Sequence, residues 1–244
     1  MSGHSKWHNI RLKKAKVDAA KSGVTSKCLR DVMLAARQGG GNPDGNFKLK
    51  IMVERAREAN VSLDSITRAI KRGTGEGDGG PMEELTYEAY GPGGAAILVE
   101  AATDNRNRTA SEIRFIFSKH GGRMAEVGAV SWMFEQKGLI ELEKDGLTED
   151  DALTLAIEAG AEDMKAEDEV YEIYTAPDDL DAVRTKIEAT KAKIVSADLT
   201  MIPKTMVTLD ADDVDKMIRL LSAIEEQDDV SNIHTNFDMP EESE

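Results

Sequence analysis

A run of basic residues near the N-terminus is the clearest candidate for chemistry in this sequence. Six lysines and arginines fall within residues 6–21, with Asp18 as the single acid among them and Trp7 at the start of the run. Basic side chains wrapped around a helix suit contact with a phosphate backbone, and an indole suits stacking on an exposed base. A solvated surface helix with Trp7 as a packing anchor is the alternative. The candidate nucleic-acid-binding residues are Lys6, Trp7, Arg11, Lys13, Lys14, Lys16, Lys21 and Lys27.

The net charge of the whole chain, −15 over 244 residues, would by itself argue against a nucleic-acid partner. The charge is unevenly divided, however. Residues 1–75 hold 16 basic and 6 acidic side chains, a net charge of +10, and residues 76–244 hold 15 basic and 40 acidic ones, a net charge of −25. This asymmetry predicts an anionic partner at the N-terminal end.

The segment Thr103-Asp-Asn-Arg-Asn-Arg-Thr109 is a second candidate anion contact. It leaves an apolar run and enters a predicted helix, for which Thr109 and Glu112 form a capping-box pattern. Arg106 and Arg108, together with free backbone N–H groups at the helix start, would suit a phosphate. Capping with solvated arginines is an equally good interpretation.

No pattern predicts an enzyme, a cofactor or a metal site. Gly75-Glu-Gly-Asp-Gly-Gly80 matches G-x-G-x-x-G, but it follows a predicted helix instead of a strand, so a linker is the better interpretation. His4 and His8 lack a nearby carboxylate or thiol partner. The acidic run from Asp210 to Asp215 lacks the glycine and glutamate of a calcium loop and is typical of a helix N-terminus.

The single cysteine, Cys28, excludes an intramolecular disulfide and is expected to be a packed thiol in a reducing compartment. The sequence begins without the apolar stretch of a secretory signal and contains no run of about 18 apolar residues that would span a membrane. A cytoplasmic location is therefore predicted, with no membrane partner.

The hydrophobic pattern predicts an α+β chain that begins with helices. Apolar residues repeat at helical spacing over 29–36, 49–56 and 63–70, with a loop at 39–45 and Gly73 as a C-terminal cap. Beyond the glycine-rich linker, the predicted strands are 85–90, 95–102, 129–134, 139–142, 163–166, 170–174, 193–201, 205–209 and 230–237, with a turn at Gln136-Lys-Gly138. The predicted helices there are 108–120, 149–159, 178–191 and 212–226.

The order of these elements predicts three domains. Residues 1–78 form a basic helical domain that binds nucleic acid. Residues 137–202 read β-α-β-β-α-β, the ferredoxin-like order, and form an inserted α/β domain. The flanking residues, 79–136 and 203–244, form one discontinuous α/β domain around that insertion.

Several motifs resemble the YebC/PmpR family, which includes a mitochondrial translational activator of cytochrome c oxidase. They occur in family order over most of the chain and are Gly3-His-Ser-Lys-Trp7 with Asn9-Ile10, Arg68-Ala-Ile-Lys-Arg-Gly-Thr-Gly75, Tyr90-Gly-Pro-Gly-Gly94, Thr103-Asp-Asn-Arg-Asn-Arg-Thr109 and Val130-Ser-Trp-Met-Phe134. The chain departs from the family at Asn46-Phe-Lys-Leu-Lys50, where Asn-Pro-Arg-x-Arg is common. The resemblance implies a helical domain followed by two α/β domains, and no catalysis.

Two functions remain open from the sequence. The resemblance implies a DNA-binding transcriptional regulator on promoter DNA, and it also implies a translation factor that binds ribosomal RNA and relieves stalling, for example at proline runs. No segment reads as a helix-turn-helix with side chains spaced for base edges, and the predicted ferredoxin-like sheet lacks the aromatic signature of an RNA-recognition motif. The acidic modules could meet basic ribosomal or other proteins.

Overall fold

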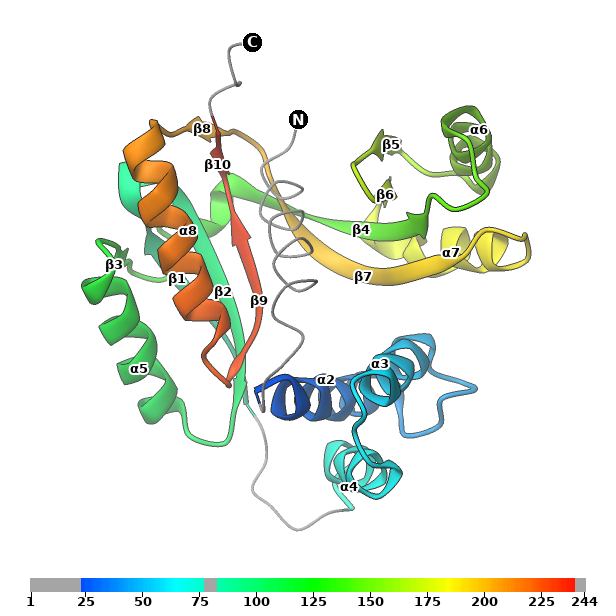
Figure 1. Ribbon diagram of the computed structural model, residues 1–244, viewed down its shortest axis with the longest axis horizontal. Helices are drawn as coiled ribbons and strands as arrows, with labels where there is room; N and C mark the ends of the chain where they lie inside the picture. Colours follow the sequence, from blue (N-terminus) through cyan, green and yellow to red (C-terminus); the bar gives the residue numbers. More distant parts are fainter. Residues whose placement is uncertain (1–22, 77–82, 240–244) are drawn as a thin grey trace. The chain divides into compact units, whose positions relative to one another are not determined.

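The computed structural model describes residues 23–76 and 83–239, with the side chains of 23–26 excepted. Contacts divide these residues into two compact units. Unit 1 contains residues up to 134 together with 203–239, and unit 2 contains residues 135–202. The α+β class is confirmed, with helices first and mixed helices and sheets after them (Figure 1). None of the described helices is long and apolar enough to cross a membrane.

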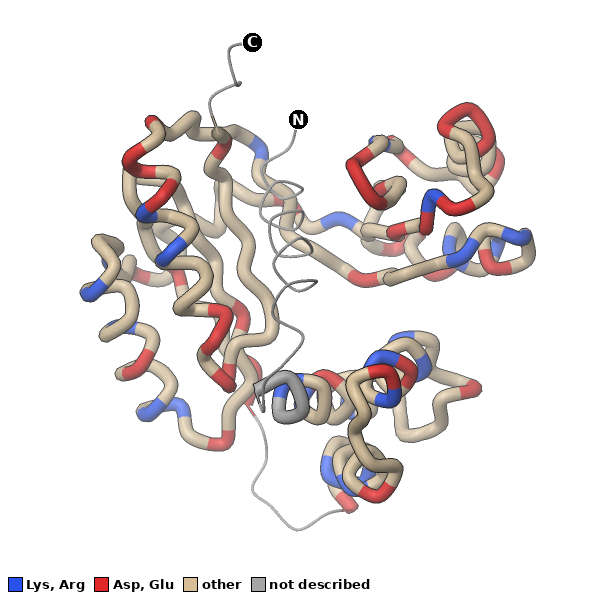
Figure 2. Tube along the Cα trace, viewed as in Figure 1, with Lys and Arg blue, Asp and Glu red and all other residues tan. Residues whose placement is uncertain are grey.

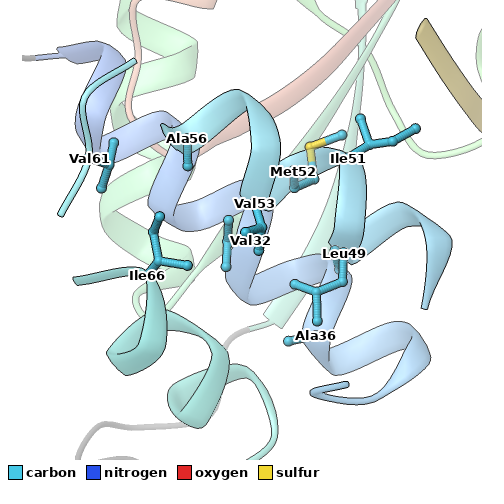
Figure 3. Packing of buried hydrophobic residues seen from close by; sticks show 10 residues of the cluster. Val32, Ala36, Leu49, Ile51, Met52, Val53, Ala56, Val61 and Ile66 are labelled. Atoms are coloured by element: carbon cyan, nitrogen blue, oxygen red, sulfur yellow. The ribbon is translucent and has the colours of Figure 1, made fainter. Parts of the chain in front are cut away.

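Unit 1 begins with three helices, as the apolar spacing predicts. They are α2 (Gly23–Gly39), α3 (Phe47–Glu58) and α4 (Leu63–Gly73). Figure 3 shows the apolar faces of these helices meeting in one core, in which Val32, Leu49 and Ala56 are fully buried and Ile66 reaches in from α4. The basic segment at 6–21 lies outside the described residues.

Two polar or small residues fix how these helices meet. Asn46 caps α3 by accepting a hydrogen bond from the backbone N–H of Leu49, while its amide donates to the carbonyl of Ala35 on α2 at 2.8 Å. Gly73 was predicted to be a C-terminal cap, but it is the last residue of α4, and Gly75 takes the left-handed conformation with φ of +82°. A Cβ atom on Gly73 would lie 2.2 Å from the carbonyl oxygen of Met33, so this glycine allows α4 to approach α2 closely.

The rest of unit 1 is a four-stranded sheet in the order β3-β1-β2-β9, with α5 and α8 packed on it (Figure 1). Strands β1 and β2 form an antiparallel hairpin, and β2 pairs antiparallel with β9, so residues before and after unit 2 share one sheet, as predicted. A short parallel pair, β8 and β10, lies outside it. The elements are β1 (Glu83–Tyr90), η1 (Pro92–Gly94), β2 (Ala96–Thr103), α5 (Arg106–Lys119), β3 (Arg123–Met124), η2 (Ser131–Met133), β8 (Val207–Thr208), α8 (Ala211–Glu225), β9 (Val230–Thr235) and β10 (Phe237–Asp238).

Unit 2 has the predicted β-α-β-β-α-β order, and its sheet order β5-β6-β4-β7 is that of a ferredoxin-like fold. Ile140 and Leu142 of β4 and Ile173 of β6 are buried in its core. The elements are β4 (Phe134–Glu143), α6 (Glu149–Ala159), β5 (Asp163–Ala166), β6 (Val170–Thr175), η3 (Pro177–Asp179), α7 (Leu180–Glu188) and β7 (Ile194–Pro203).

Several predicted boundaries were wrong. Residues 129–133 form a loop and the 3-10 turn η2 instead of a strand. The predicted turn at Gln136-Lys-Gly138 lies inside β4, where a Cβ atom on Gly138 would come within 2.1 Å of Thr175 Oγ1. Gly138 therefore marks the close approach of two paired strands. The predicted helix 178–191 begins as the 3-10 turn η3 and ends at Glu188, and the predicted strand 205–209 shrinks to β8.

Candidate nucleic-acid interface

The helical region carries a basic outer surface opposite its apolar core. On α3, Lys50 and Arg57 are exposed, and on α4 the residues Arg68, Lys71 and Arg72 follow one another at one-turn spacing, also exposed. Lys and Arg are spread along α3 and α4 in Figure 2, whereas acidic residues gather on α6 and at both ends of α8. Apart from Leu63, which is 61% exposed at the start of α4, the large apolar side chains of α3 and α4 face the core, and the cations face solvent.

The pairing of these five side chains decides which are available to a ligand. Arg68 pairs with Asp64 on its own helix at 3.2 Å, and both side chains are largely exposed. Arg72 lies 3.8 Å from Asp104 of the first sheet. For Lys50, Arg57 and Lys71, no ion pair is found among the described residues. Within the described part of the chain, no ion pair holds these three side chains, although Glu54 lies one helical turn from both Lys50 and Arg57.

Of the binding residues predicted from the sequence, the structure describes only Lys27. Lys6, Trp7, Arg11, Lys13, Lys14, Lys16 and Lys21 lie outside the described residues. Lys27 lies on α2, and its Nζ donates to the main-chain oxygen of Glu225 and lies 3.9 Å from Glu225 Oε1. The residues predicted from the sequence end at Lys27 and do not include the exposed cations of α3 and α4. Their polar spacing opposite the apolar stripes was the signal that could have found them.

The second predicted anion contact is built differently from the expectation. Helix α5 begins at Arg106, and Asn105 is its N-cap, accepting from the backbone N–H of Arg108. The predicted capping box at Thr109 was therefore wrong. Thr109 is fully buried inside the first turn, and its hydroxyl donates to Asp229 Oδ2 at 2.6 Å. Thr109 serves a buried carboxylate 120 residues away, which local sequence could not reveal.

Asp229 is the centre of a buried polar cluster in unit 1. Its side chain is 4% exposed and lies 3.2 Å from the guanidinium groups of both Arg108 and Arg30. The hydroxyl of Thr103 also donates a hydrogen bond to Asp229 Oδ2, at 3.2 Å. Burial alone would raise the pKa of Asp229, but the hydroxyl of Thr109 and the two guanidinium groups outweigh burial and lower it.

This cluster changes the interpretation of the two arginines in the predicted anion contact. Arg108 donates to Asp229 and Asp104, and these carboxylates raise its pKa, with Asp229 the larger cause. The guanidinium of Arg108 is thus already paired with carboxylates inside unit 1, which reduces its availability to a phosphate. Arg106 is exposed at the first position of α5. The Arg108 side chain is also exposed, by 46%, but its guanidinium is paired with two carboxylates. The second anion contact remains a prediction, for which Arg106 is the better candidate of the two.

The remaining sequence interpretations concern capping and metals. Asp210 caps α8, accepting from the backbone N–H of Asp213 at 2.8 Å, as predicted. Cys28 is half-buried on α2, and burial raises the pKa of its thiol. Within residues 23–76 and 83–239, no group of three or more His, Cys, Asp or Glu side chains is placed to hold a metal ion.

Both the helical region and the α/β regions of this chain are similar to those of known proteins. Residues 5–76 match the family model described as the TACO1/YebC protein N-terminal domain, and residues 82–237 match that of the TACO1/YebC second and third domain. A protein from Pelotomaculum thermopropionicum named "Probable transcriptional regulatory protein" is 53% identical, over 98% of this chain and 99% of its own. One with the same description from Sulfurihydrogenibium is 51% identical, over 99% and 97%.

A solved structure agrees with the sequence matches. The crystal structure of a conserved hypothetical protein from Aquifex aeolicus superposes with a TM-score of 0.84 at 44% identity, covering 93% of this chain and 94% of that one. The fold, the two family matches and the full-length relatives all agree. The chain belongs to the TACO1/YebC family.

Proposed function

We propose that this chain is a non-enzymatic regulatory protein that binds nucleic acid through its helical region. The observation that carries the proposal is the exposed basic surface of α3 and α4, where Lys50, Arg57 and Lys71 have no carboxylate partner among the described residues. Such cations displace counterions from a phosphate backbone, and binding of this kind weakens steeply with salt. The regulatory names of the relatives support the same role.

The first candidate target is promoter DNA, as for a DNA-binding transcriptional regulator. The relatives named as probable transcriptional regulatory proteins support this target. The second candidate is structured RNA of the ribosome, in a factor that relieves translational stalling. One observation favours the second target. Helices α3 and α4 contain no Asn or Gln, the side chains that read adenine edges, so base recognition by this surface would be limited to contacts of its arginines with guanine, and contacts with the phosphate backbone need no such match.

The proposal includes the three-domain division into 1–78, 79–136 with 203–244, and 137–202. The boundary between the two family matches, at residues 76 and 82, and the compact unit at 135–202 support it. In this division the helical domain carries the nucleic-acid contact. The acidic α/β domains are proposed to keep the remaining surface off nucleic acid or to meet basic proteins, and the protein is proposed to act in the cytoplasm.

Charge reversal tests the interface. We expect Lys50→Glu with Arg57→Glu to weaken binding to a 20-base-pair duplex and to a ribosomal RNA hairpin, and to lower the slope of log affinity against log salt by about 1.4–1.8, because each lost phosphate contact removes roughly 0.7–0.9. The matched control is Arg114→Glu with Lys191→Glu, which changes net charge equally at two exposed sites elsewhere. Equal loss in both double variants would show a general charge effect and contradict the proposed interface.

The N-terminal segment has its own test. Lys13→Glu with Lys14→Glu is expected to weaken binding and flatten its salt dependence as well. An unchanged slope in this variant, with a reduced slope in the α3 variant, would move the interface from the segment to the helices.

The two targets are separated on one preparation at one salt concentration, by co-sedimentation with ribosomes and by titration with promoter and unrelated DNA. Tight, promoter-selective binding without ribosome association would support the transcriptional role and exclude the translational one. Ribosome association with only weak, sequence-independent DNA binding would do the reverse.

A further inference from the structure

The loop at 125–133 in unit 1 presents an aromatic side chain to solvent in a fixed position. Trp132 is 65% exposed, and Val127 in the same loop is 96% exposed. The Nε1 atom of Trp132 donates to the carbonyl of Ala129 at 3.0 Å. The polar edge of the indole is therefore satisfied inside the loop, and the apolar part is left to contact something else.

A buried carboxylate holds this loop on the sheet. Glu88 of β1 is 7% exposed, and its carboxylate accepts hydrogen bonds from the backbone N–H groups of Gly128, Val130 and Ser131, at 2.6, 2.6 and 3.0 Å. Burial would raise the pKa of Glu88, but these three donors outweigh burial and lower it. The indole is thus displayed on a preorganised loop, which reduces the entropy lost when a ligand binds.

Two cations are connected to the residues that hold the indole. The Nζ atom of Lys204 donates to the main-chain oxygen of Trp132 at 3.1 Å, and the Lys204 side chain is exposed. The guanidinium of Arg123 lies over the ring of Tyr90, 4.9 Å from its centroid, and the hydroxyl of Tyr90 donates to the same Ala129 carbonyl as Trp132. Glu126 is the one acidic residue in the loop.

The two cations near Trp132 contrast with the acidic composition of the sequence around them. The described parts of unit 1 that follow the helical region, 83–134 and 203–239, hold 8 basic and 16 acidic residues. An exposed indole with two cations on the residues that hold it, in a region that is otherwise acidic, suits a ligand that combines a flat apolar face with negative charge. An unpaired nucleotide has that chemistry, because its base stacks and its flanking phosphates are anionic.

We propose that Trp132, with Lys204 and Arg123, is a second nucleic-acid contact that takes an unpaired base of a single strand. The base stacks on the indole, and the two cations contact the phosphates on either side of it. The proposal rests on nucleic-acid binding as the proposed function. It adds a preference for single-stranded or unpaired segments, which the basic helices alone do not provide.

Tryptophan fluorescence tests the stacking directly. The chain has two tryptophans, so Trp7→Phe leaves Trp132 as the sole indole. We expect a 12-nucleotide oligo(dT) or oligo(U) to quench the emission of this variant, and a 12-base-pair blunt duplex to leave it nearly unchanged. Fluorescence anisotropy of the labelled oligonucleotides measures binding in the same samples.

Substitutions then separate stacking from structure. Trp132→Ala is expected to weaken binding of the single strand roughly tenfold, within the range for one stacked base, and Trp132→Phe to restore most of it. The matched control is Phe115→Ala, which removes a 66% exposed aromatic from α5. Lys204→Gln should lower the salt slope for the single strand by about 0.7.

The possible failures are distinguishable. Absence of anisotropy changes with the wild-type chain, which keeps Trp7, for every oligonucleotide and for the duplex would overturn the proposed function as a whole. Binding without quenching of Trp132, or an equal loss from Trp132→Ala and Phe115→Ala, would overturn this inference and leave the proposed function standing. Quenching by the duplex as strongly as by the single strand would also overturn it.

Discussion

The anchoring of the 125–133 loop by Glu88 can be tested by replacing the carboxylate with an amide of the same shape. In Glu88→Gln, one oxygen still accepts a hydrogen bond, but the other acceptor becomes an NH₂ group. That group faces either the N–H of Gly128 or those of Val130 and Ser131. At least one backbone donor loses its partner, and the negative charge that strengthened the other bonds is lost.

The expected cost follows from these bonds. Leaving a buried donor unsatisfied costs about 1–3 kcal/mol, and a hydrogen bond to a charged group contributes about 1 kcal/mol more than a neutral one. We therefore expect Glu88→Gln to lower the free energy of unfolding of unit 1 by about 2–3 kcal/mol at pH 7.

The effect should depend on pH in a defined direction. Because the folded-state pKa of Glu88 lies below its ordinary value of 4.5, the ionised carboxylate stabilises the fold above that pH. This contribution is lost as the pH falls through the lowered folded-state pKa. The difference in stability between the wild-type chain and Glu88→Gln should be complete at pH 7 and should shrink below pH 4.5.

The assay is urea unfolding followed by circular dichroism and by Trp132 emission in the Trp7→Phe background, together with hydrogen exchange of the loop amides. Glu84→Gln is the control, because Glu84 is on the same strand and is exposed. The reasoning would be refuted by equal stability of the two variants, or by a difference for Glu88→Gln that stays constant from pH 7 to pH 3.

Two further predictions concern unit 1. Asp229→Asn should destabilise it by about 3 kcal/mol in urea unfolding, because Arg30, only 18% exposed, loses the charge that it faces. Adding Arg30→Met should recover more than half of this loss. Strictly additive losses in the double variant would contradict this explanation. Gly73→Ala should cost about 1–3 kcal/mol in thermal or urea unfolding, because its Cβ atom would collide with the carbonyl oxygen of Met33; the wild-type melting temperature in this variant would refute the proposed close approach.

Much of the fold could be predicted from local sequence. The amphipathic repeats around Val32, Leu49 and Ile66 predict α2, α3 and α4, because a helix buries every third or fourth residue. The element order of unit 2 and the acidic N-terminus of α8 follow from the same kind of local pattern. The split of the charge into a basic helical region and an acidic remainder is also fixed by the sequence.

The sites that depend on long-range contacts could not be predicted in this way. Thr109 has the pattern of a capping residue, but its hydroxyl belongs to Asp229, and Glu88 resembles any charged strand residue until the loop 40 residues later donates to it. Gly138 resembles a turn glycine, although it allows β4 to lie against Thr175 of β6. In each case the partner is distant in sequence, and local propensity carries no information about it.

The sequence by itself therefore determined the class of each region and the sign of its charge, since both follow from residue type and spacing. The tertiary structure decided which charged side chains remain available. In the folded chain, Arg108 and Arg30 form ion pairs with Asp229, whereas Lys50 and Arg57 stay exposed at the surface. Trp132 is exposed on a loop that is held by hydrogen bonds. Availability depends on which groups meet in space, and only the folded chain brings them together.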